Sequence, residues 1–93
     1  PAYFFEFTAA LAEAGKQLGF PDDIAERLAR STFIGAAKLL EQSGEDPVAL
    51  RIAVTSPGGT TQAALETFET ANLRELVAKA ATAAHTRSLE LSK

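Results

Sequence analysis

The sequence contains no cysteine, methionine or tryptophan and only one histidine. Without cysteine the chain can form neither a disulfide framework nor a thiol nucleophile, which is compatible with the reducing cytoplasm, the compartment we expect. His85 lies in a helical pattern near its C-terminal end, where we expect an exposed side chain that interacts with the helix dipole. No histidine lies near Asp22 and Asp23, and Ser56 has no base beside it. We therefore expect neither a metal site nor a hydrolytic site.

The sequence also has no long apolar run and no cluster of basic residues. Its formal net charge is −3, with acidic and basic residues interspersed. Such a pattern favours neither nucleic acid nor a membrane as a partner. The chain begins with Pro1 instead of methionine. We expect it to be a fragment of a longer protein.

The composition predicts a small core that a second subunit completes. A single domain of 93 residues buries only about 60–65% of the surface of its unfolded chain. Nineteen residues are alanine, and each removes little apolar area from water. Four of the seven aromatic residues lie within the first seven positions, and one helix cannot turn all four towards its own small domain. A subunit partner is the expected source of the missing burial.

Apolar residues recur at intervals of three and four along the chain, which predicts an all-α domain of five helices. Only the short run 52–55 is equally compatible with a strand. Gly19 and Gly44 suit the left-handed residue that ends a helix, and Asp23 with Glu26 has the spacing of a capping box. The helices are expected over residues 2–18, from 23 to about 43, from 47 towards the turn at 56, over 61–70, and over 73–91.

The segment from Val54 to Leu65 predicts a turn that leads into the start of a helix. Pro57 fixes one backbone angle, Gly58 and Gly59 allow angles forbidden to other residues, and Thr60 or Thr61 can cap the helix. A helix start leaves about four N–H groups unpaired and carries roughly half a positive charge, so an anion fits there. No lysine follows the glycine pair, which favours a small carboxylate over a nucleotide phosphate.

Further residues make this segment more specific than a plain turn. The run Val54-Thr55-Ser56-Pro57-Gly58-Gly59-Thr60-Thr61, followed by Ala64-Leu65 and Phe68-Glu69, resembles the signature of pyrroline-5-carboxylate reductases. Pro1-Ala2-Tyr3 and the final helix also look like that family's C-terminal domain. The resemblance implies that residues 1–93 are a C-terminal dimerisation and substrate-binding domain, like the C-terminal domain of 6-phosphogluconate dehydrogenase. In this family, the helices of two subunits interlock, and many members form rings of five dimers.

The resemblance also implies an activity, the NAD(P)H-dependent reduction of 1-pyrroline-5-carboxylate to L-proline, the last step of proline biosynthesis. It makes Ser56, Gly58, Gly59, Thr60 and Thr61 the cradle for the substrate carboxylate. Thr61 matches the hydroxyl thought to bond the ring nitrogen, and is the expected catalytic residue. No Gly-x-Gly-x-x-Gly motif follows a strand. NADPH or NADH is therefore expected to bind mainly to an N-terminal Rossmann-type domain that this chain lacks.

Two alternative functions are compatible with the same residues. One is a non-catalytic helical module that self-associates and whose diglycine turn binds nothing. The other is the equivalent helical domain of a dehydrogenase that reduces a different imino or keto acid.

Overall fold

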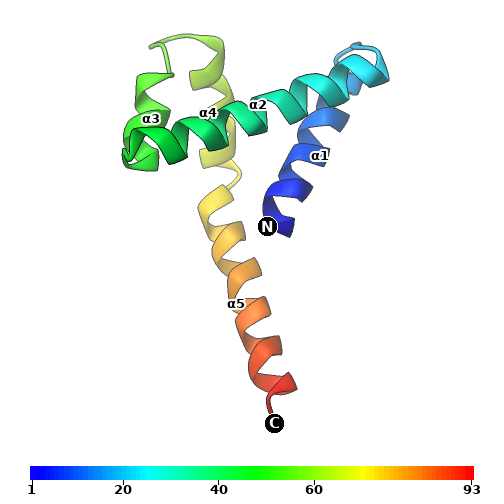
Figure 1. The fold of residues 1–93 in the computed structure, drawn as a ribbon, viewed down its shortest axis with the longest axis vertical. Coiled ribbons are helices and arrows are strands. Elements are labelled where there is room, and N and C mark those ends of the chain that lie inside the picture. The colour runs from blue at the N-terminus through cyan, green and yellow to red at the C-terminus, as the bar shows by residue number, and fades with distance from the viewer. The chain divides into compact units, whose positions relative to one another are not determined.

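The computed structural model describes all 93 residues and contains five helices and no strand (Figure 1). The predicted all-α fold is confirmed, and the ambiguous run 52–55 is the end of a helix and the start of a loop. The chain divides into two units, Pro1–Leu50 and Arg51–Lys93. The helices are α1 (Ala2–Gln17), α2 (Asp22–Ser43), α3 (Pro47–Ala53), α4 (Thr60–Thr70) and α5 (Leu73–Leu91).

The first unit is built on α1 and the first half of α2, which pack against each other in opposite directions. The turn between them contains Gly19 in the left-handed region, at φ 105°, as predicted. Small residues form the contact, because a Cβ on Gly15 would lie only 3.1 Å from the Cβ of Ala25. The three buried residues of the chain are all alanines of this pair: Ala12, Ala25 and Ala29. Close approach of the two backbones thus takes the place of a core of large side chains.

Two further contacts hold this pair at its two ends. Phe4 of α1 stacks on Phe33 of α2, with 6.0 Å between ring centroids. At the other end, Lys16 Nζ donates to Glu26 Oε1 at 3.0 Å. This hydrogen bond to Glu26 raises the pKa of the Lys16 ammonium above its usual value. The stacked rings and the ion pair therefore set the register of α1 against α2.

The helix ends of this unit follow the expected signals in part. Gly44 ends α2 in the left-handed region at φ 65°, and Asp46 caps α3 by accepting the Val48 N–H at 3.1 Å. The predicted capping box of Asp23 and Glu26 is wrong. Helix α2 begins at Asp22 after Pro21 without a side-chain cap, and both aspartates lie in its first turn. There they complement the positive end of the helix dipole through their charge.

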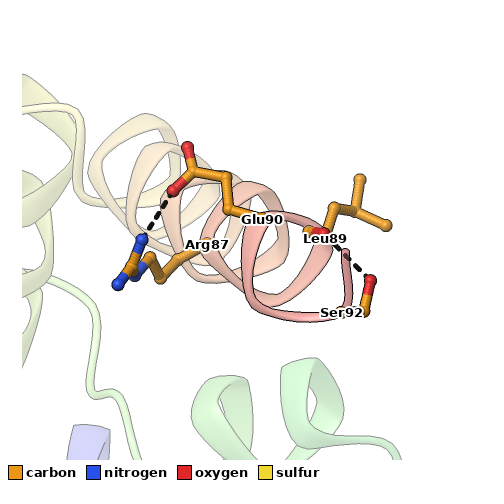
Figure 2. Close-up of polar contacts among 4 residues, drawn as sticks. All are labelled: Arg87, Leu89, Glu90 and Ser92. Atoms are coloured by element: carbon orange, nitrogen blue, oxygen red, sulfur yellow. Dashed lines mark hydrogen bonds and ion pairs between the residues drawn. The ribbon is translucent and has the colours of Figure 1, made fainter.

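The second unit contains α4 and α5, joined by Asn72 in the left-handed region at φ 60°. Neither helix has a buried residue. Polar side-chain contacts within α5 are local. Glu75 pairs with Lys79, and Arg87 pairs with Glu90 at 2.9 Å. Figure 2 shows the Arg87–Glu90 pair and, separately, the Ser92 hydroxyl, which donates to the Leu89 carbonyl. His85 is exposed on α5, as expected. This helix therefore presents nearly its whole surface to its surroundings.

Most large apolar side chains of both units are exposed. The first-helix aromatics are 47–64% exposed, which is far above the level of core residues. The prediction of a thin core is therefore confirmed. No helix combines the length and apolar character that crossing a membrane requires. The exposed large apolar residues are Tyr3, Phe4, Phe5, Phe7, Leu11, Leu18, Phe20, Leu28, Ile34, Leu39, Leu40, Val48, Ile52, Val54, Leu76, Val77, Leu89 and Leu91.

Candidate functional site

The segment between α3 and α4 is a tight turn whose two glycines serve different needs. The Gly59 N–H donates to the Ser56 carbonyl at 3.0 Å, which closes a four-residue turn. Pro57 is its second residue, and Gly58 is its third at φ 74°, the arrangement of a type II turn. Gly59 has an ordinary φ of −89°, but a Cβ there would lie 3.2 Å from the Ser56 carbonyl oxygen. Glycine is thus favoured at 58 by its backbone angle, whereas at 59 it avoids a tight contact with the Ser56 carbonyl.

Helix α4 begins directly after this turn and has no side-chain cap. Its N-cap residue is Gly59, and its first backbone bond runs from the Ala63 N–H to the Gly59 carbonyl at 3.3 Å. The prediction that Thr60 or Thr61 caps the helix is wrong, because the helix starts at Thr60 itself. The N-cap residue therefore has no side chain to accept a hydrogen bond. The N–H groups of the first three helical residues, 60–62, are left without an acceptor in the helix.

The hydroxyls beside these amides are also available to a ligand. Ser56, Thr60 and Thr61 are exposed, and their hydroxyls make no hydrogen bond within the chain. Thr55, in contrast, donates to the carbonyl of Arg51 four residues earlier. Thr60 and Thr61 lie in the first turn of α4, where no helical carbonyl four residues back exists. Three hydroxyls and three amides therefore share one exposed turn.

The charge distribution of this turn favours an anion. No side chain between Val54 and Leu65 is ionisable, and the first turn of α4 contains no acidic residue. The partial positive charge of the helix start is thus not balanced by a carboxylate of the chain, as it is in α2 by Asp22 and Asp23. A carboxylate ligand would fit both the charge and the hydrogen-bond donors.

The structure brings together all five predicted site residues, but it assigns two of their amides to protein oxygens. The Gly59 N–H bonds Ser56, and the Gly58 N–H bonds the side-chain oxygen Oε1 of Gln62. The available amides therefore lie one step further along, in the first turn of α4. Sequence reasoning missed Gln62. The sequence feature that could have identified it is its position three residues after the N-cap residue. A glutamine at that position often accepts a hydrogen bond from the backbone N–H of the N-cap residue.

An open cleft of about 1000 Å³ lies beside this turn, within the second unit. Its apolar lining comes from Ile52, Leu65, Phe68 and Leu73. Of the turn and the start of α4, only Pro57 and Gln62 line it. The predicted cradle thus lies at the edge of the cleft and does not form its floor.

Comparison with known proteins gives one consistent family. Residues 1–91 match the family described as pyrroline-5-carboxylate reductase dimerisation. Over all 93 residues the chain is 45% identical to pyrroline-5-carboxylate reductase of Corynebacterium melassecola and 43% identical to that of Pseudomonas aeruginosa. In each case it spans 34% of the relative's length.

Two solved structures share the fold. A pyrroline-5-carboxylate reductase from Coxiella burnetii matches the whole chain with a TM-score of 0.94 and 49% identity, over 34% of its own length. Plasmodium falciparum pyrroline carboxylate reductase with NADP bound matches 86% of the chain, over 30% of its own length, with a TM-score of 0.81 and 28% identity. From the family match along nearly its full length, we conclude that the chain belongs to the pyrroline-5-carboxylate reductase dimerisation family.

Proposed function

We propose that residues 1–93 are the C-terminal dimerisation and substrate-binding domain of an enzyme that reduces 1-pyrroline-5-carboxylate to L-proline, the last step of proline biosynthesis. One observation carries the proposal: a chain of this family contains an uncapped helix start with free amides and hydroxyls and no acid in its first turn. A five-membered ring acid offers a carboxylate of the charge and size that such a turn accepts. The proposed compartment is the cytoplasm.

In this proposal the turn binds the carboxylate and leaves the ring above Thr61. The amides of residues 60–62 donate to the carboxylate oxygens, and the hydroxyls of Ser56 and Thr60 add neutral donors. Reduction of an imine adds hydride at carbon and a proton at nitrogen. The Thr61 hydroxyl then orients the ring nitrogen and stabilises the charge that changes there, with water as the source of the proton.

The residues of this chain do not fit a dinucleotide. The chain has no strand, whereas the known glycine-rich dinucleotide fingerprint lies between a parallel strand and a helix. NADPH or NADH is therefore assigned to an N-terminal Rossmann-type domain of the complete protein. That assignment agrees with the Plasmodium relative, which was solved with NADP bound.

The proposed partner is a second copy of the same chain, with interlocked helices. The family is a dimerisation family, and the exposed apolar side chains of α1, α2 and α5 provide a surface that an obligate dimer would bury. A ring of five such dimers is the larger assembly that we propose to test. Sedimentation of the complete protein distinguishes a dimer from a decamer.

The direct test of the proposed function is an assay of the complete protein with 1-pyrroline-5-carboxylate and each nicotinamide cofactor. We expect proline as the product, and inhibition by ring carboxylates that cannot be reduced. Because the turn has no ionisable group, the affinity for proline should change little between about pH 6 and 9. Reduction of a different imino or keto acid, with no turnover of 1-pyrroline-5-carboxylate, would overturn the proposal in favour of another dehydrogenase.

A matched pair of glycine variants tests the alternative of a turn that binds nothing. Gly58 and Gly44 both have a positive φ, and at both positions an added Cβ would meet no atom within 4 Å. Alanine should strain the backbone equally at either site, by about 1–2 kcal/mol. We expect Gly58→Ala alone to weaken proline binding, whereas a self-association module would lose only stability in both variants. Gly59→Ala is less informative, because its Cβ would crowd Ser56 whether or not a ligand binds.

A further inference from the structure

The turn before α4 contains one half of a capping box. In the complete motif the N-cap side chain bonds a first-turn amide, while the third helical residue bonds back to the amide of the N-cap residue. Here Gln62 is the third helical residue, and its Oε1 accepts the N–H of Gly58, one residue before the N-cap. The other half is missing, because the N-cap residue Gly59 has no side chain. A ligand carboxylate would supply the missing acceptor.

The Gln62 amide has only one orientation that satisfies both of its neighbours. The Gly58 N–H is a donor and must face the amide oxygen. On the other side, Gln62 Nε2 donates to Glu66 Oε1 at 3.0 Å, and an ionised carboxylate can only accept. Rotating the amide by 180° would break both hydrogen bonds. Glu66, one turn further along α4, thus fixes which end of the Gln62 amide faces the turn.

The hydrogen bond to Gln62 holds the central peptide of the turn. Type I and type II turns differ mainly in the orientation of the peptide between their second and third residues, here Pro57 and Gly58. In the observed type II form the Gly58 N–H points to Gln62. The peptide is planar and trans, so the Pro57 carbonyl points the opposite way. A flip of this peptide to the type I form would exchange the directions of the Gly58 N–H and the Pro57 carbonyl. The Pro57 oxygen would then point towards the start of α4.

We propose that Gln62, oriented by Glu66, is a positioning residue that keeps the Pro57 carbonyl away from the anion-binding start of α4. This inference rests on the proposed function, because it assigns a role in binding the substrate carboxylate at that turn. Without the Gln62 side chain the type I form of the turn becomes accessible. The Pro57 carbonyl oxygen, with its partial negative charge, then competes with the substrate carboxylate for the first-turn N–H groups. The effect falls on binding and leaves the reacting imine unchanged.

The experiment compares steady-state kinetics of variants of the complete protein. Gln62→Met keeps the length of the side chain but removes both the oxygen and the nitrogen of its amide. Loss of one hydrogen bond predicts a rise in the KM for 1-pyrroline-5-carboxylate of about fivefold, with kcat changed less than about twofold. Glu66→Ala should raise KM by a smaller factor, and Glu66→Gln, which keeps a carbonyl acceptor, should restore the normal value. Glu69→Ala is the control, because the side chain of this exposed glutamate on the same helix makes no hydrogen bond or ion pair.

The double variant Gln62→Met with Glu66→Ala separates positioning from a general effect on folding. If Glu66 acts only through Gln62, the double variant has the KM of Gln62→Met alone. Additive losses, or an unchanged KM in Gln62→Met, would overturn the positioning role while the parent enzyme still reduced its substrate. Failure of the proposed function looks different, because the parent protein itself would then not reduce 1-pyrroline-5-carboxylate. Hydrogen exchange of the peptide over 56–62 should also be faster in Gln62→Met.

Discussion

The starts of α3 and α4 use similar sequence elements and reach opposite outcomes. Both follow a loop, and both have a proline nearby. At α3 the N-cap residue is Asp46, whose carboxylate accepts the Val48 N–H at 3.1 Å. At α4 the N-cap residue is Gly59, and no side chain accepts a hydrogen bond from the first-turn N–H groups. One helix start is satisfied by the chain, whereas the other is open to a ligand.

The difference depends on a single side chain at the N-cap position. An aspartate there stabilises its helix by roughly 0.5–2 kcal/mol relative to alanine. A glycine gives up the side-chain cap, but it leaves the backbone accessible to an outside group. The helix start with no proposed role in binding has a side-chain cap, whereas the one proposed to bind the substrate carboxylate has none. An uncapped helix start therefore indicates function here only together with free hydroxyls and the absence of acids from the first turn.

The largest expected effect is on kcat, from a variant at the uncapped start of α4. Thr61→Ala removes the hydroxyl proposed to orient the ring nitrogen, and should lower kcat by about 100-fold or more. Stability should change by less than about 0.5 kcal/mol, because the exposed hydroxyl makes no bond within the chain. Turnover and thermal unfolding of the complete protein measure both quantities. Thr70→Ala, at the other end of α4, is the matched control, and equal turnover in the two variants would remove Thr61 from the mechanism.

A second variant gives the uncapped start of α4 an acidic residue, as the capped start of α3 has. Thr60→Glu places an acid in the first turn of α4, which should stabilise the helix by about 0.5 kcal/mol. The same charge lies close to the bound carboxylate and should weaken proline binding about tenfold. Stability and affinity thus change in opposite directions, as calorimetry and titration with proline can measure. Thr70→Glu is the control at the far end of α4, and proline affinity that is equal in both variants would place the carboxylate elsewhere.

The smallest expected effect is on stability, from a variant at the capped start of α3. Asp46→Ala removes the cap of α3 and should cost about 1 kcal/mol of stability, seen as a lower unfolding temperature. Proline affinity should not change, because Asp46 belongs to a helix start with no proposed ligand. Asp46→Asn keeps an accepting oxygen and should recover most of the stability. If Asp46→Ala weakened proline binding as strongly as Thr60→Glu, the contrast between the two helix starts would be lost.

Helix identity could be predicted because it depends on neighbours in the sequence. The spacing of apolar residues, with Gly19, Gly44 and Asp46 at helix ends, predicted five helices close to their observed bounds. Caps were predicted less well. Asp23 with Glu26 had the spacing of a capping box, but α2 begins two residues too early for it, with Pro21 as its N-cap residue. A shift of one or two residues changes which side chain reaches which amide, and sequence signals do not define helix ends that closely.

The all-α class and the diglycine turn could be predicted from the sequence alone, because they depend on composition and on local backbone preference. The same is true of the absence of ionisable side chains between Val54 and Leu65, and of the shortage of large residues for a core. Two features became evident from the folded chain alone: Ala12, Ala25 and Ala29 form the buried contact, and the Gly58 N–H donates to the Gln62 side chain. Both outcomes depend on which atoms meet in space. Once a protein oxygen has taken a backbone donor, that donor is lost to a ligand, and sequence spacing alone does not record this.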